Sequence, residues 1–350
     1  MKILVINPGS TSTKIGLFDN EETLFEKTLR HSTEELKKFA NVSAQYAFRK
    51  EVILNALKEA EIDISQIDAA SGMGGLLRPL RGGTYEVCDK MAQDLMGDVY
   101  GSHASNLGGI IALEIARSLG KRAFITDPVV VDELEDIARI SGHPKFTRRS
   151  IFHALNQRAT ARRYCKENNL IYEENIFIVT HMGGGVSVGL HKYGRVSDCN
   201  NALDGCGPFS PERSGTLPVG DLVDLCFSGV YSQKEIRRMI TGHGGLVAYF
   251  GKNDASVLYE EADEKIKLVL DALAYQIAKE IGAFAAAASG KIDAIILTGG
   301  LANAKKLTED VCERVKFIAK TAVYPGENEL LALAQGALRV LRNEEKALVY

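Results

Sequence analysis

The sequence predicts an α/β protein of about two domains, and three observations support this. Short β-like runs alternate with long segments whose apolar residues recur at helical spacing. The second half repeats an arrangement of the first half, in which a strand, a turn of small residues and another strand follow one another. The chain has 350 residues, 45% hydrophobic and 25% charged, which is enough for about two buried cores.

The chain opens with a predicted β-hairpin. The apolar run 3–6 stops at the turn 7–14, Asn-Pro-Gly-Ser-Thr-Ser-Thr-Lys, and a second apolar run follows at 15–18. This turn holds more hydroxyls than a plain hairpin needs. With its backbone N–H groups and Lys14 it suits a phosphate or a metal–phosphate pair, and a solvated Ser/Thr-rich turn is the alternative interpretation.

The remaining elements of the first half follow from apolar spacing. A helix is predicted from Thr33 to Ala60, because its apolar residues recur at a period near 3.6. Strands are predicted at residues 3–7, 14–19, 67–72 and 122–127. The segment 134–149 is the most loop-like boundary, since it holds a glycine, a proline and a basic cluster.

The second half contains two further turns of small residues. The run 176–180 enters the turn 181–187, His-Met-Gly-Gly-Gly-Val-Ser, and a strand follows at 188–190. A buried strand at 293–298 opens a helix through the glycines of 299–303. The Ala- and Leu-rich helix that precedes it, about 263–289, is expected to pack within a domain.

The three turns together indicate a nucleotide held between two related domains. Glycine lets the backbone approach phosphate closely and donate its amide hydrogen without obstruction. Any one of these turns alone is better interpreted as a tight β-turn. The sequence lacks G-x-x-x-x-G-K-[ST] and has no G-x-G-x-x-G opening a helix after a first strand, which disfavours P-loop and Rossmann proteins.

Composition narrows the class of partner. The formal net charge of −3 disfavours a sequence-independent nucleic-acid binder. No apolar run is long enough for a signal peptide or a membrane span, so we expect a cytoplasmic protein with no nucleic-acid or membrane partner. Six scattered cysteines without C-x-x-C spacing predict reduced, mostly buried thiols.

The order of several segments resembles the acetokinase family, the acetate and butyrate kinases of the sugar kinase, Hsp70 and actin superfamily. The resemblance covers essentially the whole chain and rests on segments 7–14, 72–85, 126–128, 150–153, 181–187 and 298–303. Segments 74–85, 101–108 and 209–215 are similar to those of the butyrate kinase branch.

The resemblance implies two actin-like (ribonuclease H-like) domains with mixed sheets flanked by helices and the nucleotide in the interdomain cleft. The first domain would comprise residues 1–130 plus 326–350, completed by a C-terminal helix from about Glu329 to Glu344. The second, nucleotide-binding domain would comprise residues 131–325. We also expect a homo-oligomer, since members of the family assemble.

The implied reaction is reversible phosphorylation of butyrate by ATP with Mg²⁺, which gives ADP and butyryl phosphate. A carboxylate is a poor nucleophile toward an anionic phosphoryl group, so the enzyme must neutralise charge and align the reactants. The resemblance assigns Asn7 and Glu329 to the metal, with Glu327 as the competitor of Glu329. It assigns the nucleotide to the two phosphate loops and the adenosine segment: Asn7, Ser10, Ser12, Lys14, His181, Gly183, Gly184, Gly185, Gly299, Gly300 and Ala302.

Three residues match the catalytic positions of the family. Asp127 would position the acceptor or the metal, because a carboxylate acceptor has no proton to remove; a helix N-cap or Asx-turn before Pro128 is the alternative. His153 would stabilise the transferred phosphoryl group by hydrogen bonding, against a satisfied half-buried histidine. Arg213 would bridge carboxylate and phosphoryl oxygens, against a surface salt bridge with Glu212 or Asp221.

The acid-binding positions depart from the family pattern at one point. Met73 stands where relatives commonly carry arginine, so the substrate-binding cation would come from Arg78 or Arg81 or would be absent. His103 matches a family histidine near the acyl pocket. Three alternatives therefore stay open: a kinase for acetate, propionate or isobutyrate, a non-catalytic ATP-dependent actin-like scaffold, and an acid-binding regulatory protein.

Overall fold

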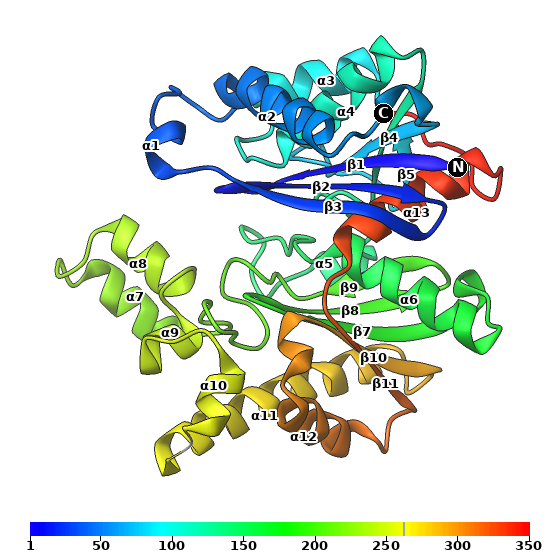
Figure 1. Ribbon diagram of the computed structural model, residues 1–350. Coiled ribbons are helices and arrows are strands. Elements are labelled where there is room, and N and C mark those ends of the chain that lie inside the picture. Colours follow the sequence, from blue (N-terminus) through cyan, green and yellow to red (C-terminus); the bar gives the residue numbers. More distant parts are fainter. Residues whose placement is uncertain (262) are drawn as a thin grey trace. The chain divides into compact units, whose positions relative to one another are not determined.

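The structure is a computed structural model that describes residues 1–261 and 263–350 (Figure 1). By its internal contacts the chain divides into two compact units. Unit 1 comprises Met1–Val131 and Asn328–Tyr350, and unit 2 comprises Asp132–Glu327. Unit 1 is therefore built from two segments that are separated in the sequence by the whole of unit 2.

Unit 1 contains a six-stranded sheet in the order β3-β2-β1-β4-β6-β5. The chain forms an antiparallel meander through β1, β2 and β3, while β4 and β6 continue the sheet parallel to β1 and β5 closes it antiparallel to β6. The strands are β1 Lys2–Pro8, β2 Ser12–Asp19, β3 Glu22–Arg30, β4 Ala69–Gly72, β5 Thr84–Glu86 and β6 Arg122–Thr126.

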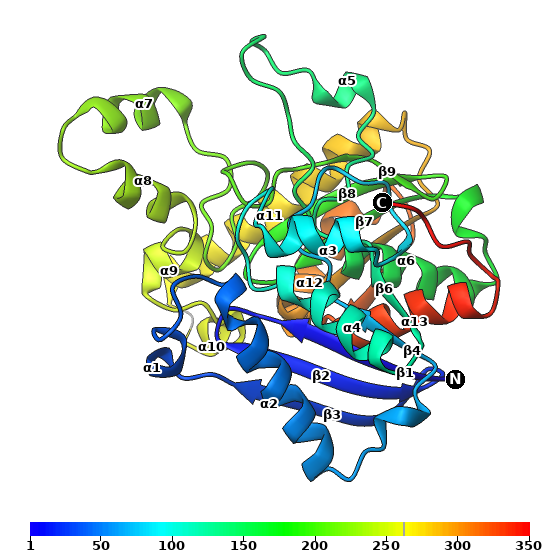
Figure 2. The ribbon, with the colours of Figure 1, turned by 90° about the horizontal axis from the view of Figure 1, so that it is seen from above.

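Helices cover both faces of this sheet (Figures 1 and 2). Two glycines allow close packing: a Cβ on Gly72 of β4 would lie 2.2 Å from the backbone oxygen of Gly108 in α4, and one on Gly336 of α13 would lie 2.0 Å from Thr126 Oγ1. The helices of unit 1 are α1 Thr33–Leu36, α2 Tyr46–Glu59, α3 Asp89–Met96, α4 Asn106–Ser118 and α13 Glu329–Leu341, with 3₁₀ turns η1 Ser43–Gln45 and η2 Ile64–Gln66.

Unit 2 repeats the strand order of unit 1. Its sheet has the order β11-β10-β7-β8-β9, with an antiparallel meander through β7, β8 and β9 and with β10 and β11 continuing parallel to β7. The strands are β7 Ile176–Met182, β8 Val186–Lys192, β9 Arg195–Cys199, β10 Ala294–Gly299 and β11 Thr321–Pro325. The repeat predicted from the sequence is thus confirmed.

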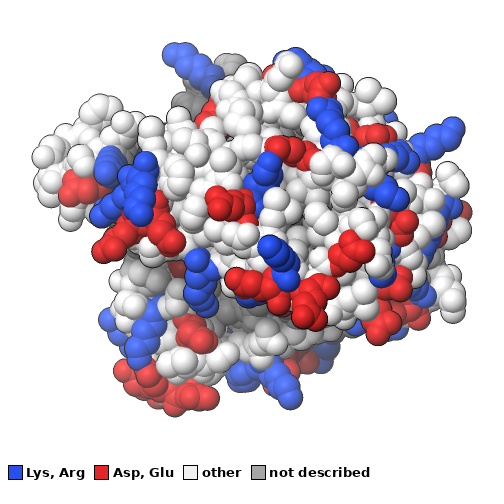
Figure 3. Space-filling view, turned by 45° about the horizontal axis from the view of Figure 1, so that its top comes forward, with Lys and Arg blue, Asp and Glu red and all other residues white. Residues whose placement is uncertain are grey.

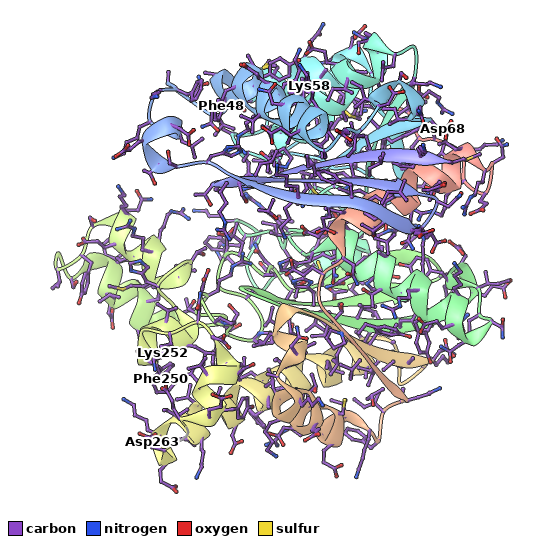
Figure 4. All side chains as sticks on the ribbon, viewed as in Figure 1. Phe48, Lys58, Asp68, Phe250, Lys252 and Asp263 are labelled. Atoms are coloured by element: carbon purple, nitrogen blue, oxygen red, sulfur yellow. The ribbon has the colours of Figure 1, made fainter. Side chains whose placement is uncertain are left out.

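Alternate residues of β7 face two different helical layers. Phe177 and Val179 pack against α6, while Ile176 and Ile178 join the core beneath α11. Asp263, labelled in Figure 4, caps α11 by accepting a hydrogen bond from Ile266 N. The helices of unit 2 are α5 Asp136–Arg139, α6 Ala154–Asn168, α7 Val219–Phe227, α8 Gln233–Ile240, α9 Gly245–Phe250, α10 Ala255–Glu260, α11 Glu264–Ala287 and α12 Lys305–Val315, with η3 Tyr172–Glu174 and η4 Gly300–Asn303.

The structure corrects several sequence predictions. The helix predicted for 33–60 is wrong as a single element, because α1 ends at its C-cap, Lys37, and a separate turn follows, where Asn41 Oδ1 accepts a hydrogen bond from Ala44 N. The last helix ends at Leu341 rather than Glu344. The six cysteines form no disulfide, as predicted. The prediction of mostly buried thiols is wrong, because only Cys165 and Cys199 are buried, whereas Cys206 and Cys312 are partly exposed and Cys88 and Cys226 are exposed. Among the described residues no helix is both long and apolar enough to cross a membrane.

Candidate functional site

The candidate residues of unit 1 gather where its parallel strands end. Asn7 lies at the end of β1, and Met73 and Asp127 directly follow β4 and β6. Because the carboxyl ends of parallel strands meet at one edge of a sheet, these residues share that edge. Ligands of α/β sheets characteristically bind outside this edge.

Asn7 and Glu329 are in direct contact within unit 1. Asn7 Nδ2 donates a hydrogen bond to Glu329 Oε2 at 2.7 Å, and Glu329 is the first residue of α13. Lys14 is the cross-strand partner of Asn7, and such pairs project from the same face of an antiparallel ladder. Glu327, the alternative metal residue, instead places its Oε1 3.6 Å from His181 Nε2 in unit 2.

The first turn is held from behind by a buried arginine that sequence reasoning missed. Arg49 of α2 is 1% exposed. It donates from Nη1 to the backbone oxygens of Gly9 (2.8 Å) and Ser12 (3.1 Å), and from Nη2 to that of Ser10 (3.1 Å). Burial lowers the pKa of its guanidinium. No sequence pattern singled it out, since a lone cation in a helix usually faces solvent.

The same buried network includes a histidine. Thr13 Oγ1 is 2.9 Å from His31 Nε2 and also accepts from Arg49 Nη1. The His31 ring makes an edge contact with Phe48, which lies on α2 (Figure 4). Ser12 and Lys14 alternate with Thr13 along β2 and therefore project from the opposite face. The turn thus has a packed inner side and an outer side that bears the predicted phosphate-binding groups.

Asp127 adopts a left-handed backbone conformation with a φ of 41°. Gly83 holds it on both sides: Asp127 N donates to Gly83 O at 3.0 Å, and Asp127 Oδ1 accepts from Gly83 N at 2.7 Å. The residue is 2% exposed and caps no helix, so the helix N-cap interpretation is excluded. Non-glycine residues in this conformation are strained and are concentrated at functional sites.

The residues predicted to bind the acid differ in how far the structure exposes them. Arg78 is exposed and stacks over the ring of Tyr350 at 4.6 Å, so its side chain is engaged at the end of the chain. Met73 is buried, with 8% of its surface exposed. His103 is exposed, and its Nδ1 accepts a hydrogen bond from Ser105 N at 3.2 Å. Arg81 is exposed as well.

The glycine turns of unit 2 lie at one edge of its sheet. The strands β7, β10 and β11 are parallel, with His181 opposite Thr298 and Gly299 opposite Pro325. A Cβ on Gly299, which has a φ of +96°, would lie 2.3 Å from Met182 O, so only glycine fits there. Gly184 and Gly300 are exposed beside this edge, whereas Ala302 is 2% exposed and packs into the core.

Two histidines and one arginine form a compact cluster in unit 2. The rings of His153 and His181 are stacked, with centroids 3.8 Å apart and an interplanar angle of 14°. Burial and the Arg213 cation lower the pKa of His153 to about 3. Burial, then His153 and Arg213, lower the pKa of His181 well below its usual range. Both histidines are therefore neutral near pH 7.

Arg213 is linked to the glycine turn through Ser210. Ser210 Oγ donates to Gly184 O at 2.6 Å and accepts from Arg213 N at 3.1 Å. Arg213 Nη1 donates to Ala202 O at 2.6 Å, and the side chain makes no ion pair within the described residues. The predicted alternative, a salt bridge with Glu212 or Asp221, is therefore absent from the described part of the chain.

Comparison with known proteins gives consistent matches. The sequence profile of the acetokinase family matches residues 142–342. Butyrate kinase 2 of Clostridium acetobutylicum is 56% identical, and a probable butyrate kinase of Clostridium botulinum (strain Alaska E43) is 55% identical. Each alignment covers 100% of this chain and 99% of the relative.

Solved structures match over nearly the full length. The acetate kinase of Porphyromonas gingivalis superposes with a TM-score of 0.78 at 20% identity, covering 97% of this chain and 99% of that one. A propionate kinase of Francisella tularensis gives a TM-score of 0.71 at 16% identity, covering 96% and 98%. At these identities the likeness establishes the fold.

Proposed function

Because this chain belongs to the acetokinase family, we propose that it transfers the γ-phosphoryl group of ATP to the carboxylate of butyrate, reversibly giving ADP and butyryl phosphate. The observation that carries this proposal is the full-length identity of 55–56% to relatives named butyrate kinase. A carboxylate oxygen forms the new bond to phosphorus while the bond to the ADP oxygen breaks. No proton is transferred.

Phosphoryl transfer to a carboxylate requires positive charge and hydrogen-bond donors in the site. A phosphoryl group in transfer carries charge on oxygens that only accept hydrogen bonds, so preorganised donors lower the barrier. We assign this role to Arg213 and the neutral His153, with the N–H groups of the turn 183–185 for the nucleotide phosphates. Asn7, Ser10, Ser12 and Lys14 of unit 1 would bind phosphate, and the turn at Gly299 and Gly300 would line the adenosine. The buried Ala302 would support that turn from the core.

Mg²⁺ fits the residues that are present. Asn7 and Glu329 offer an amide oxygen and a carboxylate, which are hard donors, and they are in contact. No group of three or more His, Cys, Asp or Glu residues suited to a metal occurs in the described part of the chain. In kinase sites Mg²⁺ is commonly bound by one or two protein groups together with substrate phosphates and water. When bound, the ion neutralises phosphate charge.

Asp127 is assigned to positioning the acceptor acid or the metal. Its backbone is held in the left-handed conformation, and its carboxylate is held by the hydrogen bond from Gly83 N to Oδ1. The carboxylate therefore has a fixed orientation. Removing its charge while keeping its shape, in Asp127→Asn, is expected to lower kcat/KM for the acid by at least about 10²-fold.

The proposed activity is tested by trapping acyl phosphate with hydroxylamine, using ATP–Mg²⁺ and acetate, propionate, butyrate, isobutyrate or valerate. We expect a maximum at butyrate or isobutyrate, loss in Asp127→Asn, and full activity in Glu309→Gln, an exposed carboxylate on α12. One methylene is worth only about 1–3 kcal/mol in an apolar pocket, so the whole panel is needed. Absence of product with every acid, despite ATP binding, would overturn the proposal.

We also propose that the protein self-associates through α7 and α8. No residue of α7 is buried, and Val219 and Phe227 are 71% and 86% exposed. In Figure 3 the upper part of the lobe at the left, which holds α7 and α8, is free of charged groups, whereas blue and red groups gather over its lower half. Exposed apolar surface of this kind marks a site of association.

Charge complementarity supports the proposal that a second copy of the chain covers this surface. Two aspartates lie on α7 and three cations lie on α8, and none of them makes an ion pair within the described residues; they are Asp221, Asp224, Lys234, Arg237 and Arg238. A two-fold axis places the same patch of each copy against the other, which would pair acidic α7 with basic α8. In a monomer, the aspartates of α7 and the cations of α8 would both lack ion-pair partners within the described residues.

Sedimentation or light scattering tests this interface with two matched variants. Phe227→Glu should lower the molar mass to that of smaller assemblies. Phe317→Glu changes a phenylalanine of similar exposure, 81%, elsewhere in unit 2 and should leave the mass unchanged. Equal masses for Phe227→Glu and the unaltered protein would refute the assignment.

A further inference from the structure

A row of buried polar groups connects Tyr172 to His153 in unit 2. Tyr172 Oη lies 2.7 Å from His191 Nδ1, and His191 Nε2 lies 3.0 Å from Gln157 Oε1. Gln157 Nε2 lies 2.9 Å from Ser187 Oγ, which is 2.8 Å from His153 Nδ1. His191, Gln157 and Ser187 are fully buried. Each group therefore has to satisfy its neighbours within this row.

A backbone carbonyl fixes which group donates and which accepts in each hydrogen bond of this row. Gln157 Nε2 is 2.9 Å from Ser187 O, an oxygen that can only accept, so the amide nitrogen must be the atom that faces Ser187. Gln157 Oε1 then faces His191, which must donate from Nε2. His191 Nδ1 is left to accept from the Tyr172 hydroxyl. Burial, then Arg158 and Arg162, lower the pKa of His191, which keeps it neutral.

The hydroxyl of Ser187 determines which nitrogen of the His153 ring carries the hydrogen. Its two acceptor positions receive Gln157 Nε2–H and the backbone N–H of His153, the latter at 3.3 Å. Its single hydrogen is then donated to His153 Nδ1. A neutral His153 that accepts at Nδ1 carries its hydrogen on Nε2.

The stacked partner, His181, is fixed the opposite way. Asn156 Nδ2 donates to the backbone oxygen of Glu327 at 2.9 Å, which turns Asn156 Oδ1 toward His181. Asn156 Oδ1 lies 2.7 Å from His181 Nδ1, so His181 must carry its hydrogen on Nδ1. Asn156 and Gln157 are neighbours on α6, and each sets one of the two rings.

We propose that Gln157, acting through Ser187, is a positioning residue that fixes His153 as a neutral Nε2–H donor, while Asn156 fixes His181 as the Nδ1–H tautomer. The role of that donor rests on the proposed phosphoryl transfer, because phosphoryl oxygens only accept hydrogen bonds. The other tautomer would present a lone pair to an anionic oxygen and repel it. The Nδ1–H tautomer leaves Nε2 of His181 bare beside Glu327 Oε1, 3.6 Å away, so His153 is the ring that offers a donor.

Nitrogen NMR of the full chain tests the tautomers without any substrate. The protein is labelled with ¹⁵N-histidine, and the ring signals are assigned by their loss in His153→Gln and His181→Gln. We expect a bare Nδ1 and a protonated Nε2 for His153 and the reverse for His181 near pH 7. The same tautomer in both rings, or a doubly protonated His153, would overturn the proposal.

Two variants then test the assigned causes. Gln157→Met keeps the length of the side chain but removes both hydrogen-bonding atoms. It should mix the tautomers of His153 and lower kcat roughly 10²-fold with little change in the KM for ATP. Asn156→Leu should alter the signals of His181 and leave those of His153 unchanged. An unaltered His153 spectrum in Gln157→Met would refute the relay.

The two readouts separate this inference from the proposed function. Opposite tautomers in the unaltered protein, shifted by the variants as stated, would support the relay even if no acid yielded an acyl phosphate. Acyl phosphate formation with a single shared tautomer would retain the function and reject the relay.

Discussion

Replacing Gly185 by alanine should lower kcat by about 10²- to 10³-fold while changing the free energy of unfolding by less than about 1 kcal/mol. A Cβ at this position would lie 2.1 Å from Arg213 Nη1 and 2.5 Å from its Cζ. The guanidinium is the end of a flexible side chain, so it can move away at small cost. It would then leave the cluster that it forms with His153 and His181.

A double-mutant cycle identifies the cause of this loss. Arg213→Ala alone should lower kcat by about 10³-fold, the range found when a charge-stabilising arginine is removed from phosphoryl-transfer sites. If alanine at position 185 acts only by displacing Arg213, adding it to Arg213→Ala should cause no further loss. A double variant that is much less active than Arg213→Ala would mean that the new methyl group meets the nucleotide directly.

Arg49→Met should lower the free energy of unfolding by about 2–4 kcal/mol and raise the KM for ATP. The substitution preserves much of the buried volume but removes the arginine donor from the backbone oxygens of Gly9 and Ser10. The oxygen of Ser12 keeps only its hydrogen bond from Gly9 N. A trans peptide unit directs its N–H opposite to its C=O. With their carbonyls turned to Arg49, the amides of Ser10 and Thr11 point away from it, and losing Arg49 would release them.

Urea unfolding and steady-state kinetics measure the two effects. Arg49→Lys is the matched control: it keeps the charge but concentrates three donors at one point, so it cannot span these carbonyls and Gln45 Oε1 together. We expect it to fall between the unaltered protein and Arg49→Met in both measurements. Unchanged stability and KM in Arg49→Met would contradict a supporting role for the arginine.

The sequence identified the elements that carry a strong local signal. The hairpin at Asn7 and the glycine turn at Gly183 combine buried apolar runs with small residues, a pattern set by neighbours in the chain. The strands β3, β5, β9 and β11 were missed because they are the edge strands of the two sheets, where polar residues interrupt the apolar run, as in Glu22–Arg30. Edge strands are held by backbone hydrogen bonds that any sequence can make. Their sequences therefore show little of the apolar pattern from which a strand is predicted.

Sequence patterns singled out candidate site residues, whether exposed as Ser10 or buried as Asp127, but not the residues that support them. Arg49 lies 40 residues from Gly9, and only packing shows that this cation faces the turn rather than solvent. Asn156 and Gln157 could have been found, because they lie three and four residues after His153 and so share a helix face with it. Their roles still depend on backbone carbonyls whose position no spacing predicts.

The late position of α13 has a consequence for biosynthesis. This helix packs on the sheet of unit 1, where Leu333 O accepts from Ser71 Oγ and Gly336 lies against Thr126. Unit 2 is translated in full before α13 is made. The first 131 residues therefore emerge from the ribosome while the face of their sheet that α13 later covers is still exposed. This apolar surface can bind chaperones or aggregate until synthesis is nearly finished.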